Sequence, residues 1–305
     1  MRALLIVNPH ATSTTERRRD LLAHALAGEL SLKVARTESR GHAAHLAAAA
    51  ADSGVDVVVV HGGDGTVNEV ANGLMYRGVR PDVPMLAVVP GGSTNVFARA
   101  MGVDPDPTVA TEQILEALAA QRVRTVSLGR ADERYFTFNA GLGLDAETVR
   151  AVEKRRAAGR TITNAMHVRD AILQFFRAHR RTPRMSLELP GRDRIDDAHL
   201  VFVSNVDPWT YLGNVPIRTN PGTSPTTGLG VFALTSMSLP HGLQAATAIV
   251  SGRTSGGKHV VRTDDVPWAT VRCREPVAFQ MDGDYLGERS EVKFTSVPRA
   301  LRLVV

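Results

Sequence analysis

Hydrophobic and polar positions alternate between strand and helix patterns through the first 125 residues. Short unbroken apolar runs predict buried strands, and apolar residues spaced three and four apart predict amphipathic helices. We expect strands at 2–8, 31–37, 55–61 and 84–90, and helices at 20–30, 42–54, 66–75, 94–102 and 106–122. This order is typical of a mostly parallel sheet covered by helices, an α/β domain.

The pattern changes after Arg124, where many short strands separated by turn residues follow. We expect strand structure at 124–141, interrupted by a turn at 131–134, and strands at 185–191, 198–205, 230–237, 259–266, 269–283, 290–296 and 300–305, with helical stretches at 144–180 and 240–251. Such a series predicts an antiparallel β-sandwich. The sequence therefore predicts two domains, an α/β domain at 1–125 and a β-sandwich domain at 126–305.

The 305-residue chain carries a net charge of +5, with arginine-rich stretches at 17–19, 154–156 and 175–184. This charge favours an anionic partner (nucleotide phosphate, acidic lipid or nucleic acid), although a solvated arginine-rich surface explains it equally well. No helix-turn-helix, RNP or zinc pattern supports nucleic acid. A single cysteine, Cys273, cannot form an internal disulfide. With no signal-peptide pattern and no long apolar run, we expect a cytoplasmic protein.

Glycine-rich turns follow two of the predicted strands, HGGDGT at 61–66 and PGGSTN at 90–95. A third strand ends in the polar turn NPHAT at 8–12. Glycine lets backbone N–H groups converge on a phosphate, and the N-terminus of the following helix adds partial positive charge. Because parallel strands end at one edge of a sheet, these three turns predict one phosphate-binding site.

Asp64 lies among these glycines, where its carboxylate would repel a phosphate. A bridging Mg²⁺, bound directly or through water, would remove the conflict, whereas the alternative is that Asp64 only tightens the turn. Two known phosphate motifs do not fit. The dinucleotide fingerprint would need glycine at Asn68, and the P-loop-like stretch at 252–258 is followed by His259 where Ser or Thr should bind magnesium.

GGDGTVNEV (62–70) followed by GGSTNVFARAMG (91–102), with NP in the first turn, resembles the diacylglycerol kinase catalytic-domain family, which includes bacterial lipid kinases and sphingosine kinases. FNAGLGLDAETV (138–149) and MDGDYLGE (281–288) also match in order and spacing. The GGDGT motif alone is shared with NAD kinases and phosphofructokinase-like enzymes. The resemblance implies that ATP binds in a cleft between the α/β domain and the β-sandwich.

The resemblance also implies roles for individual residues. Asp64 would act with the catalytic Mg²⁺, and Asp284 would be the catalytic base, although the family has glutamate in this D-G-E motif. The same Asp-Gly pair is also a preferred hairpin turn, which would need no catalytic role. The implied ATP-binding residues are Asn8, Pro9, His10, Ala11, Thr12, Thr37, Gly62, Gly63, Asp64, Gly65, Thr66, Val67, Asn68, Glu69, Gly91, Gly92, Ser93, Thr94 and Asn95.

A second departure from the family pattern lies at 220–230, where soluble members hold a structural Mg²⁺ through acidic residues. The corresponding positions here are Ser224, Thr227 and Leu229, and Thr227 replaces the expected carboxylate. A neutral hydroxyl is a poor sole anchor for Mg²⁺. We therefore expect this chain to lack the structural metal while keeping the catalytic one.

The implied reaction transfers the γ-phosphoryl group of ATP to a lipid hydroxyl, with diacylglycerol as the first candidate and phosphatidic acid as the product. The alternatives are another acceptor (a monoacylglycerol, a sphingoid base, a glycolipid or NAD) or a non-catalytic nucleotide- or lipid-binding protein. Such an enzyme would work peripherally at the inner face of the membrane. Ile172, Phe175 and Phe176 beside neighbouring arginines predict an interfacial helix or, alternatively, a helix packed on its own domain. Exposed strand edges would permit a homodimer.

Overall fold

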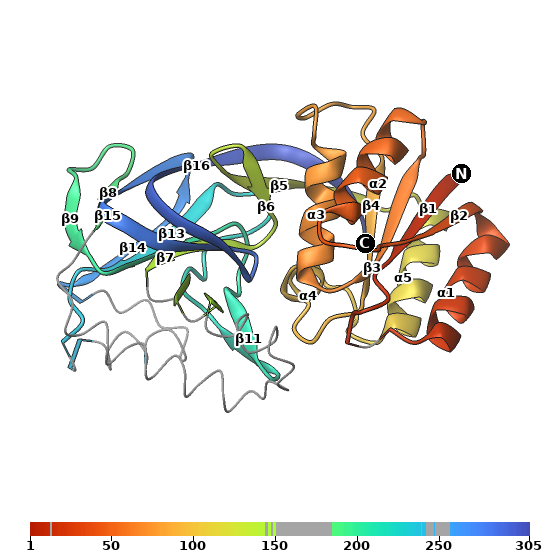
Figure 1. Cartoon of the computed structure of the whole chain (residues 1–305), viewed down its shortest axis with the longest axis horizontal. Coiled ribbons are helices and arrows are strands. Elements are labelled where there is room, and N and C mark those ends of the chain that lie inside the picture. Colours follow the sequence, from red (N-terminus) through yellow and green to blue (C-terminus); the bar gives the residue numbers. More distant parts are fainter. Residues whose placement is uncertain are drawn as a thin grey trace. The chain divides into compact units, whose positions relative to one another are not determined.

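The computed structural model describes residues 1–12, 14–143, 146–147, 149–150, 185–238, 240–241, 247 and 257–305. The chain forms two compact units (Figure 1). The first unit contains Met1–Leu128 and Pro298–Val305, and the second contains Gly129–Val297. The predicted helical stretches at 144–180 and 240–251 lie almost entirely outside the described residues, and the predicted interfacial residues lie wholly outside them.

A parallel sheet forms the centre of the first unit. Its strands are β1 (Arg2–Val7), β2 (Ser31–Arg36), β3 (Val57–Gly62) and β4 (Met85–Pro90), in the order β4-β3-β1-β2. Every pairing among them is parallel, with Val57–Gly62 aligned to Met85–Pro90. Beyond β4, Leu303 near the end of β16 (Asp284–Val304) pairs in parallel with Leu86.

Helices connect these strands as the sequence predicts. They are α1 (Glu16–Glu29), α2 (His42–Asp52), α3 (Asp64–Leu74), α4 (Val96–Ala100) and α5 (Pro107–Ala119). Thr15 begins α1 by accepting a hydrogen bond from Arg18 N, and Asp106 begins α5 in the same way. Leu26 of α1 and Ile114 of α5 share a core with Leu5 and Val59, so α1 and α5 cover one face of the sheet. The predicted parallel α/β region is confirmed.

The second unit is a largely antiparallel β structure. Its strands are β5 (Val123–Ala131), β6 (Arg134–Phe136), β7 (Asn139–Gly143), β8 (Met185–Glu188), β9 (Ile195–Ala198), β10 (Leu200–Ser204), β11 (Thr210–Leu212), β12 (Val215–Ile217), β13 (Leu229–Leu234), β14 (Val260–Val266), β15 (Trp268–Met281) and β16. The main path runs β14-β13-β10-β7-β15-β16, and β15 also pairs with β8. Phe136, Leu142, Val231 and Phe294 meet in one buried core.

The structure differs from the predicted elements in several places, one of which is β9, a strand that was not predicted. The predicted strands at 290–296 and 300–305 are parts of one continuous strand, β16. The hairpin β11–β12 was not predicted, because its strands have three residues each. The predicted second domain ran to residue 305, whereas the last eight residues cluster with the first unit. Among the described helices, none is long and apolar enough to cross a membrane.

Candidate functional site

The two glycine-rich turns pack directly against each other at the carboxyl ends of β3 and β4. Gly91 N donates a hydrogen bond of 2.8 Å to Gly62 O. A Cβ atom on Gly91 would lie 2.9 Å from Gly62 Cα, and one on Gly92 would lie 2.7 Å from Gly63 Cα. Real side chains do not approach a backbone this closely. The glycine pairs are therefore needed for loop packing, whether or not a phosphate binds.

Asp64 is the first residue of α3 and is half-buried. Its Oδ1 accepts a hydrogen bond of 3.3 Å from Phe97 N at the beginning of α4. A carboxylate at a helix N-terminus is favoured by the partial positive charge there. The start of α3 and Phe97 N thus stabilise the negative charge of the Asp64 carboxylate, whether or not a Mg²⁺ is bound. A single oxygen ligand of this kind fits a Mg²⁺ that takes its other ligands from water and nucleotide phosphates.

Asn95 braces the second glycine turn. It has a left-handed backbone with φ of 48°, and its side chain accepts from Gly92 N at 2.9 Å and donates to Gly92 O at 2.8 Å. Both glycine N–H groups therefore already have acceptors within the first unit: Gly92 N donates to Asn95, and Gly91 N donates to Gly62 O. Ser93 is exposed and Thr94 half-buried, so these two residues form the accessible part of the turn.

The first turn, which we call the β1 loop (residues 8–12), is joined to the loop after β3. Asn8 N donates to His61 O at 3.0 Å, and Asn8 Nδ2 donates to Thr66 Oγ1 at 3.0 Å. His10 N donates to Asn8 Oδ1 at 2.9 Å, which tightens the turn. The structure therefore brings all three predicted loops together at one sheet edge.

Several of the predicted ATP-binding side chains point into the first unit instead. Both carboxylate oxygens of Glu69 accept backbone hydrogen bonds at the start of α2, from Gly41 N at 2.8 Å and Ala43 N at 3.2 Å. Val67 and Asn68 are buried, and Thr37 N donates to Val7 O. Glu69 thus caps a helix. Of the predicted ATP-binding residues, the exposed ones are Pro9, His10, Thr12 and Ser93, and the half-buried ones are Asn8, Ala11, Gly63, Asp64, Gly65, Glu69, Gly92 and Thr94.

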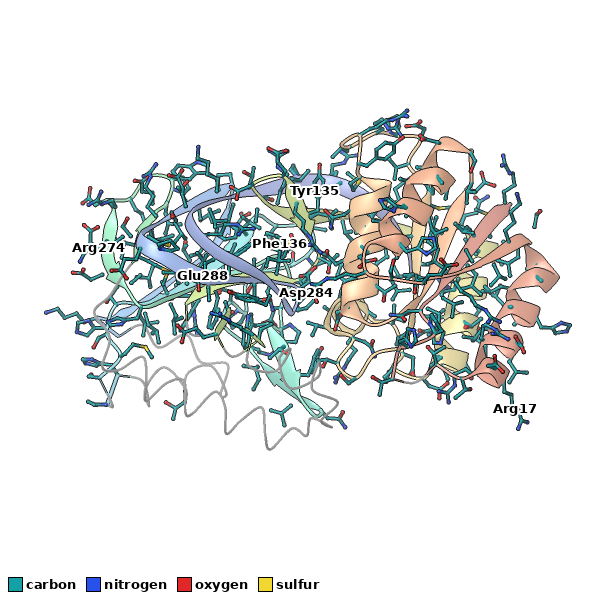
Figure 2. The ribbon with its side chains drawn as sticks, in the orientation of Figure 1. Arg17, Tyr135, Phe136, Arg274, Asp284 and Glu288 are labelled. Carbon is teal, nitrogen blue, oxygen red and sulfur yellow. The ribbon has the colours of Figure 1, made fainter. Side chains whose placement is uncertain are left out.

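Asp284 lies in the second unit, immediately after the turn that joins β15 to β16 (Figure 2). The turn residues Asp282 and Gly283 have φ of 48° and 80°, which is the pattern of a type I′ hairpin turn. The Asp-Gly pair is therefore a structural turn, and it fixes the position of Asp284, which is half-buried. Both interpretations of this motif from the sequence remain compatible with the geometry.

A residue that the sequence did not single out, Asp282, anchors this turn. Its buried carboxylate accepts hydrogen bonds from Thr137 N at 2.6 Å, Thr137 Oγ1 at 2.8 Å, Phe138 N at 3.0 Å and Asn139 N at 3.0 Å. Burial raises the pKa of Asp282, and these donors oppose that rise. Asn139 is in turn held by Gln280 Nε2 at 3.0 Å. The hairpin is thus tied to β7 through a buried polar network.

The loop at 220–230 does not offer a Mg²⁺ site. Thr227 Oγ1 accepts from Ser224 N at 2.9 Å and lies 2.9 Å from Ser224 O, to which it donates. Asp264 Oδ1, the neighbouring carboxylate oxygen, accepts from Asn220 and Thr223, and Leu229 is fully buried. Across the described residues, no three or more His, Cys, Asp or Glu side chains gather into a metal-binding group. The loop closes through its own hydroxyl groups and through Asp264 and Asp265 of β14, which accept hydrogen bonds from it; at the predicted positions, Ser224, Thr227 and Leu229, it offers Mg²⁺ no carboxylate.

Part of the chain is similar to a known kinase domain. The model of the diacylglycerol kinase catalytic domain matches residues 2–131. Diacylglycerol kinase of Bacillus subtilis (strain 168) is 38% identical over 108 residues, which cover 35% of this chain and 33% of the relative. The matched part of this chain thus spans only a third of that relative's length.

Solved structures extend the likeness of fold to the whole chain. A crystal structure of a diacylglycerol kinase from Bacillus anthracis strain Sterne has a TM-score of 0.73 at 22% identity, covering 99% of this chain and 96% of that one. An NAD kinase from Archaeoglobus fulgidus in complex with ATP has a TM-score of 0.52 at 14% identity, covering 100% and 94%. Residues 2–131 are therefore similar to the diacylglycerol kinase catalytic domain, and the whole chain shares the fold of a solved diacylglycerol kinase.

Proposed function

We propose that this protein is an ATP-dependent lipid kinase that transfers the γ-phosphoryl group of ATP to a lipid hydroxyl, with diacylglycerol as the acceptor. The observation that carries the proposal is the convergence of three loops with Asp64 at one sheet edge, in a domain of the kinase family. Phosphoryl transfer depends mainly on positioning and charge neutralisation. An edge that combines hydroxyls, helix N-termini and one carboxylate supplies those functions.

The residues take distinct roles in this proposal. The accessible loop residues, Ser93 and Thr94 among them, would bind the phosphates, and Asp64 would hold the Mg²⁺ that neutralises their charge when bound. Asp284 would accept the proton of the lipid hydroxyl. This role requires the Asp284 carboxylate to come within hydrogen-bond reach of that hydroxyl. The turn before Asp284 supports this role, because the buried hydrogen bonds of Asp282 anchor the backbone next to Asp284. Aspartate is one methylene shorter than the family's glutamate.

An insoluble acceptor requires the enzyme to work at a membrane surface, so we propose peripheral action at the cytoplasmic face. The net charge of +5 supports this location, because each Lys or Arg near an anionic surface contributes about 1 kcal/mol.

The test is ADP release from Mg²⁺-ATP with diacylglycerol in mixed micelles, with NAD and no acceptor as parallel reactions. Asp284→Asn should reduce diacylglycerol-dependent kcat by about 10²-fold or more with nucleotide affinity retained. Glu288→Gln is the matched control on the same strand (Figure 2), and it should leave turnover unchanged because Glu288 is exposed and its ion pair with Arg150 lies at the surface. Turnover that survives in Asp284→Asn would remove this residue from the mechanism. Turnover with NAD alone would refute the lipid acceptor.

A further inference from the structure

His61, the buried first residue of the first glycine turn, contacts the β1 loop at Asn8, the chain beyond that loop at Thr14, and β4 at Val89. Its main-chain oxygen accepts from Asn8 N at 3.0 Å, at the start of the β1 loop. Its Nε2 lies 3.0 Å from Thr14 Oγ1, beyond the other end of that loop. Its Nδ1 lies 3.2 Å from Val89 O, just before the second glycine turn. One residue therefore holds the β1 loop from both sides.

The partners of His61 determine its tautomer. A carbonyl oxygen only accepts, so Nδ1 carries the proton and donates to Val89 O. In the neutral ring Nε2 is then an acceptor, and the Thr14 hydroxyl donates to it. Burial lowers the pKa of His61, and nearby Arg18 lowers it further, while the Val89 bond acts in the opposite direction. The imidazole is thus neutral and has both of its nitrogens in use.

Other hydrogen bonds of the β1 loop, among the described residues, mostly stay within the loop itself. Ala11 N donates to Asn8 O at 3.2 Å and Thr14 N donates to Ala11 O at 3.1 Å, which links the loop internally. Pro9, His10 and Thr12 are exposed. A loop that is free at one end must be ordered when a ligand binds, and that ordering reduces affinity. The His61–Thr14 bond adds a restraint at the end of the loop opposite Asn8, next to the start of α1 at Thr15.

We propose that His61 is a positioning residue for the nucleotide, which keeps the β1 loop in its binding conformation through the Thr14 hydroxyl. The inference rests on the proposed function, because it assumes that the loops bind ATP. It adds to that function a residue which need not touch the nucleotide. We expect the effect on ATP binding rather than on the phosphoryl-transfer step, because His61 acts on the loop and not on the reacting atoms.

Thr14 provides the sharper test, because it is only half-buried and its replacement should not disturb folding. Thr14→Val removes the hydroxyl at nearly constant shape, Thr14→Ser keeps the hydroxyl, and the readout is the ATP dissociation constant by calorimetry without acceptor. We expect Thr14→Val to weaken ATP binding about two- to tenfold, the equivalent of one hydrogen bond, with kcat unchanged. Thr14→Ser, which keeps the hydroxyl, should bind ATP with an affinity within about twofold of the wild type.

Thr15→Val is the matched control. Thr15 caps α1 by accepting from Arg18 N at 3.2 Å, so its loss should lower Tm without changing ATP affinity. The second variant is His61→Phe, which removes both ring nitrogens. In that background Thr14→Val should have no further effect on ATP affinity, because the hydroxyl has already lost its partner.

Two results would overturn the proposal while leaving the kinase assignment intact. One is equal ATP affinity for the wild type and Thr14→Val. The other is an effect of Thr14→Val that persists at full size in the His61→Phe background, since the hydroxyl would then act through a different group. Absence of ATP binding in the wild type would instead refute the proposed function.

Discussion

The close contact of the two glycine turns makes a strong prediction for Gly92→Ala. The added Cβ would lie 2.7 Å from Gly63 Cα and 3.0 Å from Asn95 Oδ1. The first contact is with backbone, which cannot rotate away, and the second would disturb the side chain that braces the turn. Overpacking of this kind costs about 1–3 kcal/mol of unfolding free energy. The two loops must therefore separate or the unit must lose stability.

The assay is thermal unfolding without ligand, followed by ATP titration. At roughly 2–4 °C per kcal/mol, Gly92→Ala should lower Tm by about 2–12 °C and also weaken ATP binding. Gly28→Ala is the matched control, because Gly28 is exposed on α1 and a Cβ added there would meet no described atom within 4 Å. It should be neutral or stabilising by up to about 1 kcal/mol.

Gly92→Ala with normal Tm but lost ATP binding would contradict this reasoning. That result would mean that Gly92 is needed so that a phosphate can approach the backbone, as the sequence alone suggested. It would also mean that the two loops can move apart to accommodate a methyl group at little cost in stability.

Two further predictions concern residues whose observed partners differ from those implied by the family resemblance. Glu69→Gln should weaken the cap at Gly41 and Ala43 and so lower the unfolding free energy by about 0.5–2 kcal/mol, with ATP affinity unchanged. A loss of ATP affinity at constant Tm would show that Glu69 contacts the nucleotide instead. Wild-type Tm without nucleotide should not respond to chelation, whereas Thr227→Asp should acquire a Mg²⁺-dependent rise in Tm, because it supplies the missing carboxylate beside Ser224. A wild-type Tm that falls when a chelator is added would contradict the conclusion that the loop at 220–230 holds no structural Mg²⁺.

The sequence was sufficient for the first unit because local pattern and tertiary position agree there. Each strand is a short apolar run that ends in a turn, and each helix has periodic apolar residues. The second unit was less predictable. The two strands expected at 290–296 and 300–305 form one strand, β16, which continues through Pro298 although proline cannot donate a ladder hydrogen bond, and Arg299 next to it adopts a φ of 52°.

The loops of the site were predictable, but the tasks of their side chains were not. Sequence shows two carboxylates around Gly283 and cannot tell which is buried, because the partners of Asp282 lie 143 to 145 residues away in the chain. Glu69 belongs to a recognised motif, and only the fold shows that α2 begins at its carboxylate. The signal for His61 was its position in a buried strand, where an imidazole must find partners for both nitrogens.

The return of β16 to the first unit has a consequence for folding. Val304 lies in the core of that unit, Leu303 pairs with β4, and Arg302 donates to Val83 O at 2.6 Å. These residues follow the whole second unit in the chain. During synthesis the edge of β4 therefore stays open until the second unit has been made, and open strand edges are prone to aggregation. A fragment limited to residues 2–131 would leave that edge of β4 unpaired, so we expect it to aggregate more readily than the whole chain.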